Sequence, residues 1–249
     1  MAPGLFPQGP YTVAVMGAGS GIGRAAAETL AAHGATIAAI DRDEAGCRET
    51  AAAVAAAGGK ASAHTTDVTN DSDIRALLQR LGPQALVNCA GVTGRTNVKA
   101  ADVDLADFDQ VYRINLRAAL VVSQAVLPGL VERGYGRVLH LASIAGKDGN
   151  AGMAAYSATK AGLIGLVKSM AKDYAATGIT INALAPAVIR TPMVAALPQA
   201  TIDYMTAKIP MGRTGTLEEA AAMIAWIVSP ACSFTTGFCF DLSGGRAVY

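Results

Sequence analysis

Short apolar runs alternate with longer, helix-like segments along the chain. The apolar or strand-like runs cover residues 11–16, 35–40, 60–66, 85–87, 136–141, 180–184 and 238–242. The segments with helical composition between them cover residues 24–33, 44–57, 71–81, 105–133, 154–176 and 216–228. Strands that alternate with helices of about 10–15 residues are typical of a parallel, doubly wound sheet. We therefore expect an α/β fold over residues 1–249, a single Rossmann-type domain of about seven strands with helices on both faces.

One long segment departs from this alternation. Residues 187–215 contain Pro192, Pro198 and Pro210 and show little helical or strand periodicity. Long segments of this kind in a compact domain are usually lids or binding loops. We therefore expect a substrate-binding lid here, followed by a helix whose start is marked by the capping-box pattern of residues 216–219.

Composition narrows the class of protein. The 249 residues are 52% hydrophobic, enough for one large core, and the net charge is +1 without a basic block for nucleic acid. The four cysteines lack metal-ligand spacing, so we expect reduced thiols and no metal site. Residues 1–10 lack the basic and apolar parts of a secretory signal, and glycine and proline interrupt the uncharged run at 220–240. These features predict a cytoplasmic protein with no nucleic-acid or membrane partner.

A glycine-rich turn joins the first apolar run to the first helix. Its sequence is Gly17-Ala-Gly-Ser-Gly21-Ile-Gly23. Glycines let the backbone approach a pyrophosphate, and the helix start offers free N–H groups and a partial positive charge. We therefore expect Gly17, Ser20, Gly21, Ile22 and Gly23 to bind a dinucleotide. The alternative is a plain glycine-rich turn.

Asp41 follows the second apolar run. A carboxylate at this position can accept hydrogen bonds from the adenosine ribose and repels a 2′-phosphate, so it favours NAD over NADP. Arg42 partly offsets this preference. The alternative is that Asp41 only caps the helix that begins near Asp43.

Tyr156 and Lys160 lie four residues apart in a predicted helix, so they share one face of it. A phenol with its ordinary pKa near ~10 is a poor base, but an adjacent ammonium favours the phenolate. Ser143, which follows the fifth strand-like run, could hold an alcohol or carbonyl oxygen. The alternative is an exposed tyrosine and lysine on an amphipathic helix. His140, inside that run, is expected to be a hydrogen-bonded core histidine.

Together these residues resemble the short-chain dehydrogenase/reductase family, over about residues 12–245. The resemblance implies that Asn115, Ser143, Tyr156 and Lys160 are catalytic and that the protein interconverts a secondary alcohol and a ketone. Asn115 interrupts a long predicted helix, and we expect it to open the helix locally and to hold a water. The alternative is that Asn115 faces solvent.

The resemblance also implies a cofactor and an assembly. Family positions for NAD binding fall on Asp67, Val68, Asn88, Ala90, Gly91, Tyr156, Lys160, Pro186, Val188 and Thr191. Three residues depart from the family's usual ones: Met16 stands at a threonine, Cys89 at an asparagine and Ala187 at a glycine. A homotetramer is implied, with residues 105–133 and 154–176 between subunits.

The substrate is predicted to be polar. Arg95, Lys147 and Asn150 lie in two stretches that should line the pocket beside Ser143 and Tyr156, and the two cations suggest an anionic group. They could equally be solvated loop charges. The tail at 241–249 is similar to that of members acting on 2-keto-3-deoxy sugar acids, in which Arg246 or Tyr249 could reach a neighbouring subunit's site. We expect oxidation of such a sugar acid or polyol. The alternatives are a 3-oxoacyl-thioester or general ketone reductase, and a catalytically silent NAD-binding regulator.

Overall fold

A computed structural model of the chain describes residues 5–6, 11–196, 198–247 and 249. Seven strands form one sheet in the order β3-β2-β1-β4-β5-β6-β7, and every neighbouring pair is parallel. The strands are β1 (Thr12–Met16), β2 (Thr36–Asp41), β3 (Lys60–Thr65), β4 (Ala85–Asn88), β5 (Gly136–Leu141), β6 (Ile179–Pro186) and β7 (Cys239–Leu242). The predicted doubly wound sheet is confirmed. The first ten residues, predicted to be no secretory signal, fall mostly outside the described residues.

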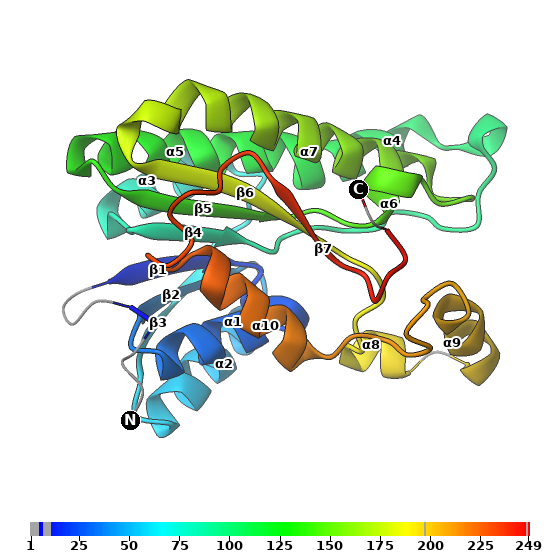
Figure 1. Cartoon of the computed structure of the whole chain (residues 1–249), viewed down its shortest axis with the longest axis horizontal. Coiled ribbons are helices and arrows are strands. Elements are labelled where there is room, and N and C mark those ends of the chain that lie inside the picture. Colours follow the sequence, from blue (N-terminus) through cyan, green and yellow to red (C-terminus); the bar gives the residue numbers. More distant parts are fainter. Residues whose placement is uncertain (1–4, 7–10, 197, 248) are drawn as a thin grey trace.

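Helices cover both faces of the sheet (Figure 1). One apolar core lies between the sheet and α1 (Gly21–Ala32), α2 (Glu44–Ala56) and α10 (Leu217–Ile227). The other lies between the sheet and α3 (Asp71–Leu81), α5 (Ala118–Arg133) and α7 (Ala154–Tyr174). The remaining elements are short: η1 (Ala100–Asp102), α4 (Leu105–Tyr112), η2 (Arg113–Arg117), α6 (Ala145–Asp148), η3 (Ala175–Thr177), α8 (Pro192–Ala195) and α9 (Gln199–Thr206).

The strand order places the glycine turn beside the end of β4. The chain runs outward from β1 to β3 and then returns to β4, so β1 and β4 become neighbours, with Met16 opposite Asn88. In open α/β sheets, ligands bind outside the carboxyl ends of the strands where the order reverses in this way. The turn after Met16 and the residues after Asn88 therefore meet at the expected binding edge.

The long predicted helix over residues 105–133 is opened in the middle. Its centre is a π-helical segment, Arg113–Arg117, and the buried Asn115 lies within it. This confirms the predicted local opening and excludes a solvent-facing Asn115. Leu105–Arg133 is also long and apolar enough to cross a membrane, but 56% of its most apolar window is buried inside the fold. Val122 and Leu130 of this segment belong to the core, and packing in the core accounts for the apolar character of the segment.

The lid region contains more helix than the sequence predicts. Pro192 begins α8, and Pro198 is the N-cap of α9. Proline disrupts a helix interior but suits the first turn, so these prolines mark helix starts rather than irregular chain. The base of the region is pinned by backbone hydrogen bonds, from Arg190 to Gly215 at 2.8 Å and from Gly215 to Val188 at 2.9 Å. The capping box from Thr216 to Glu219 is confirmed.

The residues after Ser143 also form a short helix, α6, where the sequence predicts a loop. Helix α6 packs directly against α7. The approach is so close that a Cβ on Gly146 would lie 2.6 Å from the carbonyl carbon of Lys160. Only glycine permits this approach. The helix is therefore held by a tertiary contact that no local pattern in the sequence announces.

Candidate active site

The four residues expected to be catalytic converge at the carboxyl edge of the sheet. Ser143 follows β5, and α7 carries Tyr156 and Lys160 across that strand's end. The Lys160 Nζ donates to the Leu141 carbonyl at 2.6 Å and lies 5.7 Å from the centroid of the Tyr156 ring. The Ser143 hydroxyl lies near the Tyr156 phenol and acts to lower the pKa of that phenol. The exposed-pair alternative is therefore wrong, since Lys160 is buried.

Asn115 braces the turn that follows β4. Its Oδ1 accepts from the Val92 amide at 2.8 Å, and its Nδ2 donates to the Val92 carbonyl at 2.8 Å and to Thr159 Oγ1 at 3.2 Å. A Cβ at Gly91 would be a tight fit here, 3.2 Å from Asn115 Oδ1 and 3.3 Å from Lys160 Nζ. Both amide hydrogens of Asn115 are used within the protein. A water could therefore bind Asn115 only by donating to one of its oxygens, and the role of Asn115 as a water anchor stays a prediction.

Burial sets the protonation of the tyrosine and lysine. It raises the pKa of Tyr156, and the nearby Ser143 only partly opposes that rise. Burial also lowers the pKa of Lys160 from 10.5 to about 8. Burial thus works against the phenolate, and its stabilisation by Lys160 together with a bound nicotinamide stays a prediction for the lysine. Its ammonium is directed to the Leu141 carbonyl, and desolvation of the phenolate is the larger effect.

The glycine turn has the shape of a phosphate cradle. Gly17 has φ +73°, and a Cβ there would lie 2.9 Å from the Ala90 backbone nitrogen. Ser20 is the N-cap of α1, but its side chain makes no capping hydrogen bond. The first N–H groups of α1 are thus not capped by a side chain, and a pyrophosphate could accept from them. The residues present fit a dinucleotide.

Asp41 is held at this turn and does not cap α2. Its Oδ2 accepts from the Gly19 amide at 2.9 Å, and its Oδ1 accepts from the Asp43 amide at 3.0 Å. The cap is Asp43, which accepts from the Gly46 amide. The capping alternative for Asp41 is therefore wrong. Carboxylate oxygens have further lone pairs, so Asp41 can still accept from a ribose.

Arg24 completes the turn, and sequence reasoning missed it. Its Nη2 donates to the Gly19 carbonyl at 2.7 Å, and its Nε donates to Thr50 Oγ1 at 3.1 Å. The backbone of Gly19 is thereby held at two points, its carbonyl by Arg24 and its N–H by Asp41. A signal was present, because arginine in the first turn of an alanine-rich helix opposes the helix dipole and calls for another role.

Several expected cofactor residues have internal partners. Asp67 accepts from the Thr69 amide and hydroxyl, which lowers its pKa. The Asn88 amide donates to His140 Nδ1 at 3.1 Å, and His140 Nε2 donates to Ser123 Oγ at 2.9 Å. Burial lowers the pKa of His140 to about 3, so this histidine is neutral and belongs to the core, as predicted.

The remaining expected cofactor residues frame the same edge. Thr191 Oγ1 accepts from the Val194 amide and caps α8, and its methyl group lies 3.6 Å from a Cβ built on Gly21. Pro186 ends β6, and Val188 lines a cavity under the lid region. Cys89, beside Lys160, is a half-buried thiol whose pKa desolvation raises to about 12. It is therefore unreactive at neutral pH.

The expected substrate residues do not form one cationic pocket. Both carboxylate oxygens of Asp241 bind the Lys147 Nζ at 2.9 Å, so Lys147 is not a solvated loop charge, and its contact with a substrate anion stays a prediction. Arg95 has a side chain 69% exposed and lies 3.5 Å from Asp104, as the solvated-charge alternative predicts. Asn150 Oδ1 accepts from Arg246. Asp241 was missed because it is 94 residues from Lys147 in the sequence.

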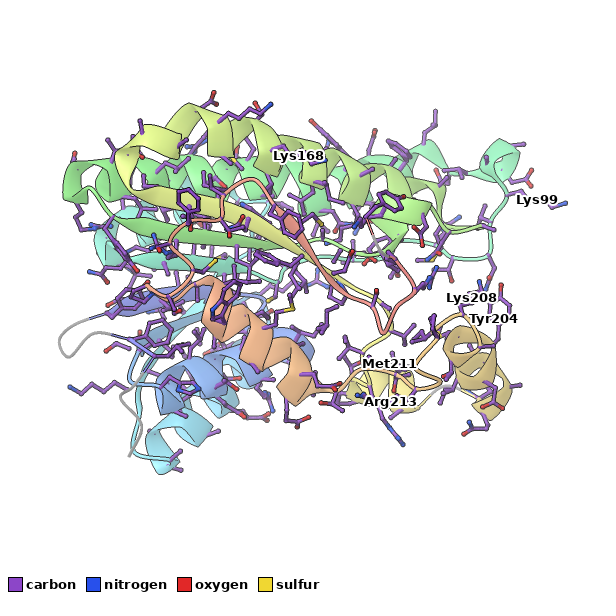
Figure 2. All side chains as sticks on the ribbon, viewed as in Figure 1. Lys99, Lys168, Tyr204, Lys208, Met211 and Arg213 are labelled. Atoms are coloured by element: carbon purple, nitrogen blue, oxygen red, sulfur yellow. The ribbon has the colours of Figure 1, made fainter. Side chains whose placement is uncertain are left out.

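A cavity of about 400 Å³ lies between the lid region and the tail. Figure 2 shows Tyr204 on α9 and Lys208, Met211 and Arg213 on the chain that follows it. The cavity lining includes Val188, Ile209, Met211, Arg213, Asp241 and Ser243. Lys208 donates to the Tyr204 hydroxyl, which lowers the pKa of that tyrosine. Among the described residues, no group of three His, Cys, Asp or Glu side chains could hold a metal ion.

Comparison with known proteins matches most of the chain to oxidoreductases. A family model described as enoyl-(acyl carrier protein) reductase matches residues 17–246. A Sphingomonas sp. (strain SKA58) protein named 2-dehydro-3-deoxy-L-rhamnonate dehydrogenase (NAD(+)) is 40% identical over 238 residues, covering 94% of each chain. Human (3R)-3-hydroxyacyl-CoA dehydrogenase is 37% identical over 245 residues, covering 93% of each. A solved structure from Beutenbergia cavernae, provisionally described as an NAD(P)-dependent gluconate 5-dehydrogenase with NADP bound at low occupancy, has a TM-score of 0.91, 33% identity and 98% coverage of each chain.

Proposed function

Because the chain belongs to the short-chain dehydrogenase/reductase family of oxidoreductases acting on CH–OH groups, we propose that it is an NAD-dependent dehydrogenase of a polar sugar acid. The substrate is a 2-keto-3-deoxy sugar acid or a related polyol, oxidised at a secondary hydroxyl. The observation that carries the proposal is the 40% identity, over 94% of the chain, to a relative named for that chemistry and for NAD(+). The proximity of Ser143, Tyr156 and Lys160 independently supports the chemistry at the hydroxyl.

In the proposed mechanism Tyr156 is the proton-transfer group. Ser143 donates a hydrogen bond to the reacting oxygen and holds it against the phenol, which fixes the geometry. Tyr156 as phenolate removes the hydroxyl proton in oxidation and returns it in reduction. Lys160 supplies positive charge beside the phenol and stabilises its charged form. The nicotinamide, held by the cofactor residues named above, supplies the hydride acceptor or donor when bound.

The pKa of Lys160 sets an expected pH dependence. Because burial lowers this pKa to about 8 while that of Tyr156 is raised, the pair loses its first proton near pH 8. Oxidation needs the Tyr156–Lys160 pair after it has lost one proton. That proton can be missing from either side chain, and the fraction of molecules with phenolate beside ammonium does not change with pH. The kcat/KM for oxidation should therefore rise about tenfold per pH unit up to pH 8 and then level off. Reduction should be level below that pH and fall above it.

Initial rates at low substrate concentration, in both directions across this range, measure the profile. NADH binding over the same range controls for unfolding. An oxidation rate that is flat through pH 8 would contradict the assignment of this proton to the Tyr156–Lys160 pair.

Asp41→Ala should weaken the preference for NAD. Loss of charge-assisted hydrogen bonds to the ribose, worth about 1.5–3 kcal/mol, corresponds to about a ten- to hundredfold lower kcat/KM with NAD⁺. NADP⁺ should gain, because its 2′-phosphate no longer meets a carboxylate. Loss of the Gly19 hydrogen bond affects both cofactors, so the ratio of the two kcat/KM values is the informative measurement.

Asp43→Ala is the matched control for Asp41. It removes a neighbouring carboxylate that caps α2, so it should lower stability and leave the cofactor ratio unchanged. An equal change of the ratio in both variants would show that the preference does not depend on Asp41.

A screen of nicotinamide absorbance tests the function itself. Sugar acids, polyols and 3-hydroxyacyl thioesters are offered with NAD⁺ and NADP⁺. Turnover of a 2-keto-3-deoxy sugar acid with NAD⁺ supports the proposal. Preference for an acyl thioester would favour the second candidate, which rests on the human relative named (3R)-3-hydroxyacyl-CoA dehydrogenase. NADH binding without any turnover would favour a regulator.

The chain is further proposed to act as a single cytoplasmic domain with a lid at residues 187–215 and to form a homotetramer. Ala161 and Gly165 leave a flat, exposed strip on α7, which suits close packing of a second helix. Ala118 and Ala119 do not contribute to such a strip, because both are buried within the chain. Light scattering coupled to size-exclusion chromatography measures the assembly.

A further inference from the structure

Asp241, Arg246 and Tyr249, near the end of the chain, contact the α6 loop, which is residues 144–150 and contains the short helix α6. Asp241 lies in β7, and both its oxygens bind the Lys147 ammonium at 2.9 Å. The Lys147 side chain is only 8% exposed, so this ion pair is largely shielded from water. Partly buried pairs of this geometry hold their partners in place more firmly than surface pairs do.

Two further tail residues contact the same loop. The Tyr249 hydroxyl donates to the Lys147 carbonyl at 3.0 Å, and its ring lies 4.8 Å from the Lys147 Nζ. The Arg246 guanidinium donates to Asn150 Oδ1 at 2.7 Å and lies 3.8 Å from Asp148. The tail thus holds both the backbone and the side chains of residues 147–150.

The opposite side of this loop rests on the reacting group. The Ala145 amide donates to Ser143 Oγ at 3.1 Å. The Gly146 backbone packs against the Lys160 carbonyl, with no room for a side chain between them. A shift of Lys147 is therefore transmitted within one or two residues to Ser143 and to the backbone of Lys160.

We propose that Asp241 is a positioning residue that, through the Lys147 ammonium, holds the loop at 144–150 where Ser143 meets the substrate oxygen. Arg246 and Tyr249 complete this brace within the same chain. Lys147 is accordingly a structural cation and not the anchor of a substrate carboxylate. The inference rests on the proposed function only in assigning Ser143 and this loop to the substrate pocket.

Asp241→Asn tests the brace, because it keeps the shape of the side chain and removes the charge. It should lower kcat/KM for the alcohol by about ten- to a hundredfold, since small displacements of a positioning group cost this much. The loss should fall mainly on KM for the alcohol, equally for neutral and acidic substrates, with the Kd for NADH unchanged. Lys147→Met combined with Asp241→Asn should be no worse than either change alone. Asp241→Glu should restore part of the activity.

Direct recognition of an anion by Lys147 predicts the opposite pattern. Lys147→Met would then impair acidic substrates only, and Asp241→Asn would leave their KM unchanged or improve it, because it frees the lysine. Either result overturns the proposal. Asp71→Asn is the matched control, because it breaks an exposed pair with Arg117 and should leave all kinetic constants unchanged.

Amide hydrogen exchange tests the brace without a substrate. Residues 144–150 should exchange faster in Asp241→Asn than in the wild type, and equal rates would refute the brace. If no sugar acid is oxidised, the proposed function fails while this measurement still decides the inference. Lys147→Gln breaks the same pair from the loop side and leaves β7 unchanged, so it replaces Asp241→Asn if that variant does not fold.

Discussion

Tyr156→Phe is expected to lower kcat/KM for alcohol oxidation by about a hundred- to ten-thousandfold, the range for loss of a general acid–base group. The variant loses only the phenolic hydroxyl, which lies near Ser143. Its ring still fills the same space above Lys160, so the fold and NADH binding should be unchanged. Single-turnover measurement of NADH formation, together with NADH binding by fluorescence, checks both statements.

Tyr174→Phe is the matched control. This tyrosine lies at the far end of the same helix, α7, where it packs against the core. The substitution should leave kcat/KM within about twofold, as is usual for changes away from a site. A Tyr156→Phe variant as active as Tyr174→Phe would remove Tyr156 from the mechanism and favour a cofactor-binding protein without this chemistry.

Lys160→Met is expected to produce the second largest loss, about a hundredfold or more in kcat/KM. The variant removes the positive charge that stabilises phenolate, and it leaves the Leu141 carbonyl without its donor. Stability should change little, because a buried cation whose pKa is lowered by desolvation is replaced by an apolar side chain of similar length. Thermal unfolding and steady-state kinetics measured on the same preparation separate the two effects.

The pH profile gives an independent check on Lys160. In the methionine variant the break near pH 8 should disappear from the oxidation profile, because the proton that leaves there belongs to the Tyr156–Lys160 pair. Persistence of that break would mean that a different group titrates. Loss of folding at neutral pH, in contrast, would show that the ammonium mainly supports structure.

The features that sequence reasoning predicts well are local or periodic. Alternating strands and helices lead to the sheet, the glycine turn leads to the cradle beside β4, and the spacing of Tyr156 and Lys160 places both on one helix face. Asn115 shows the same logic, because an amide side chain in an apolar helix interior needs buried partners. It finds them in Val92 and Thr159.

The features that it misses depend on contacts between distant segments. Lys147 looks like a free pocket cation until β7 brings Asp241 to it. The pKa of Tyr156 depends on how deeply the phenol is buried, which spacing along a helix does not reveal. Arg24 and the short helix α6 are likewise defined by what lies beside them, the Gly19 carbonyl and the Lys160 backbone.

The contact between the tail and the loop has a consequence for redesign of substrate choice. Arg246 contacts Asn150 and Tyr249 contacts Lys147, so the two segments depend on each other's sequence. A chimaera that imports only the loop from a relative would set a foreign sequence against Asp241 and Arg246. To transfer substrate specificity between relatives, both segments should therefore be exchanged together.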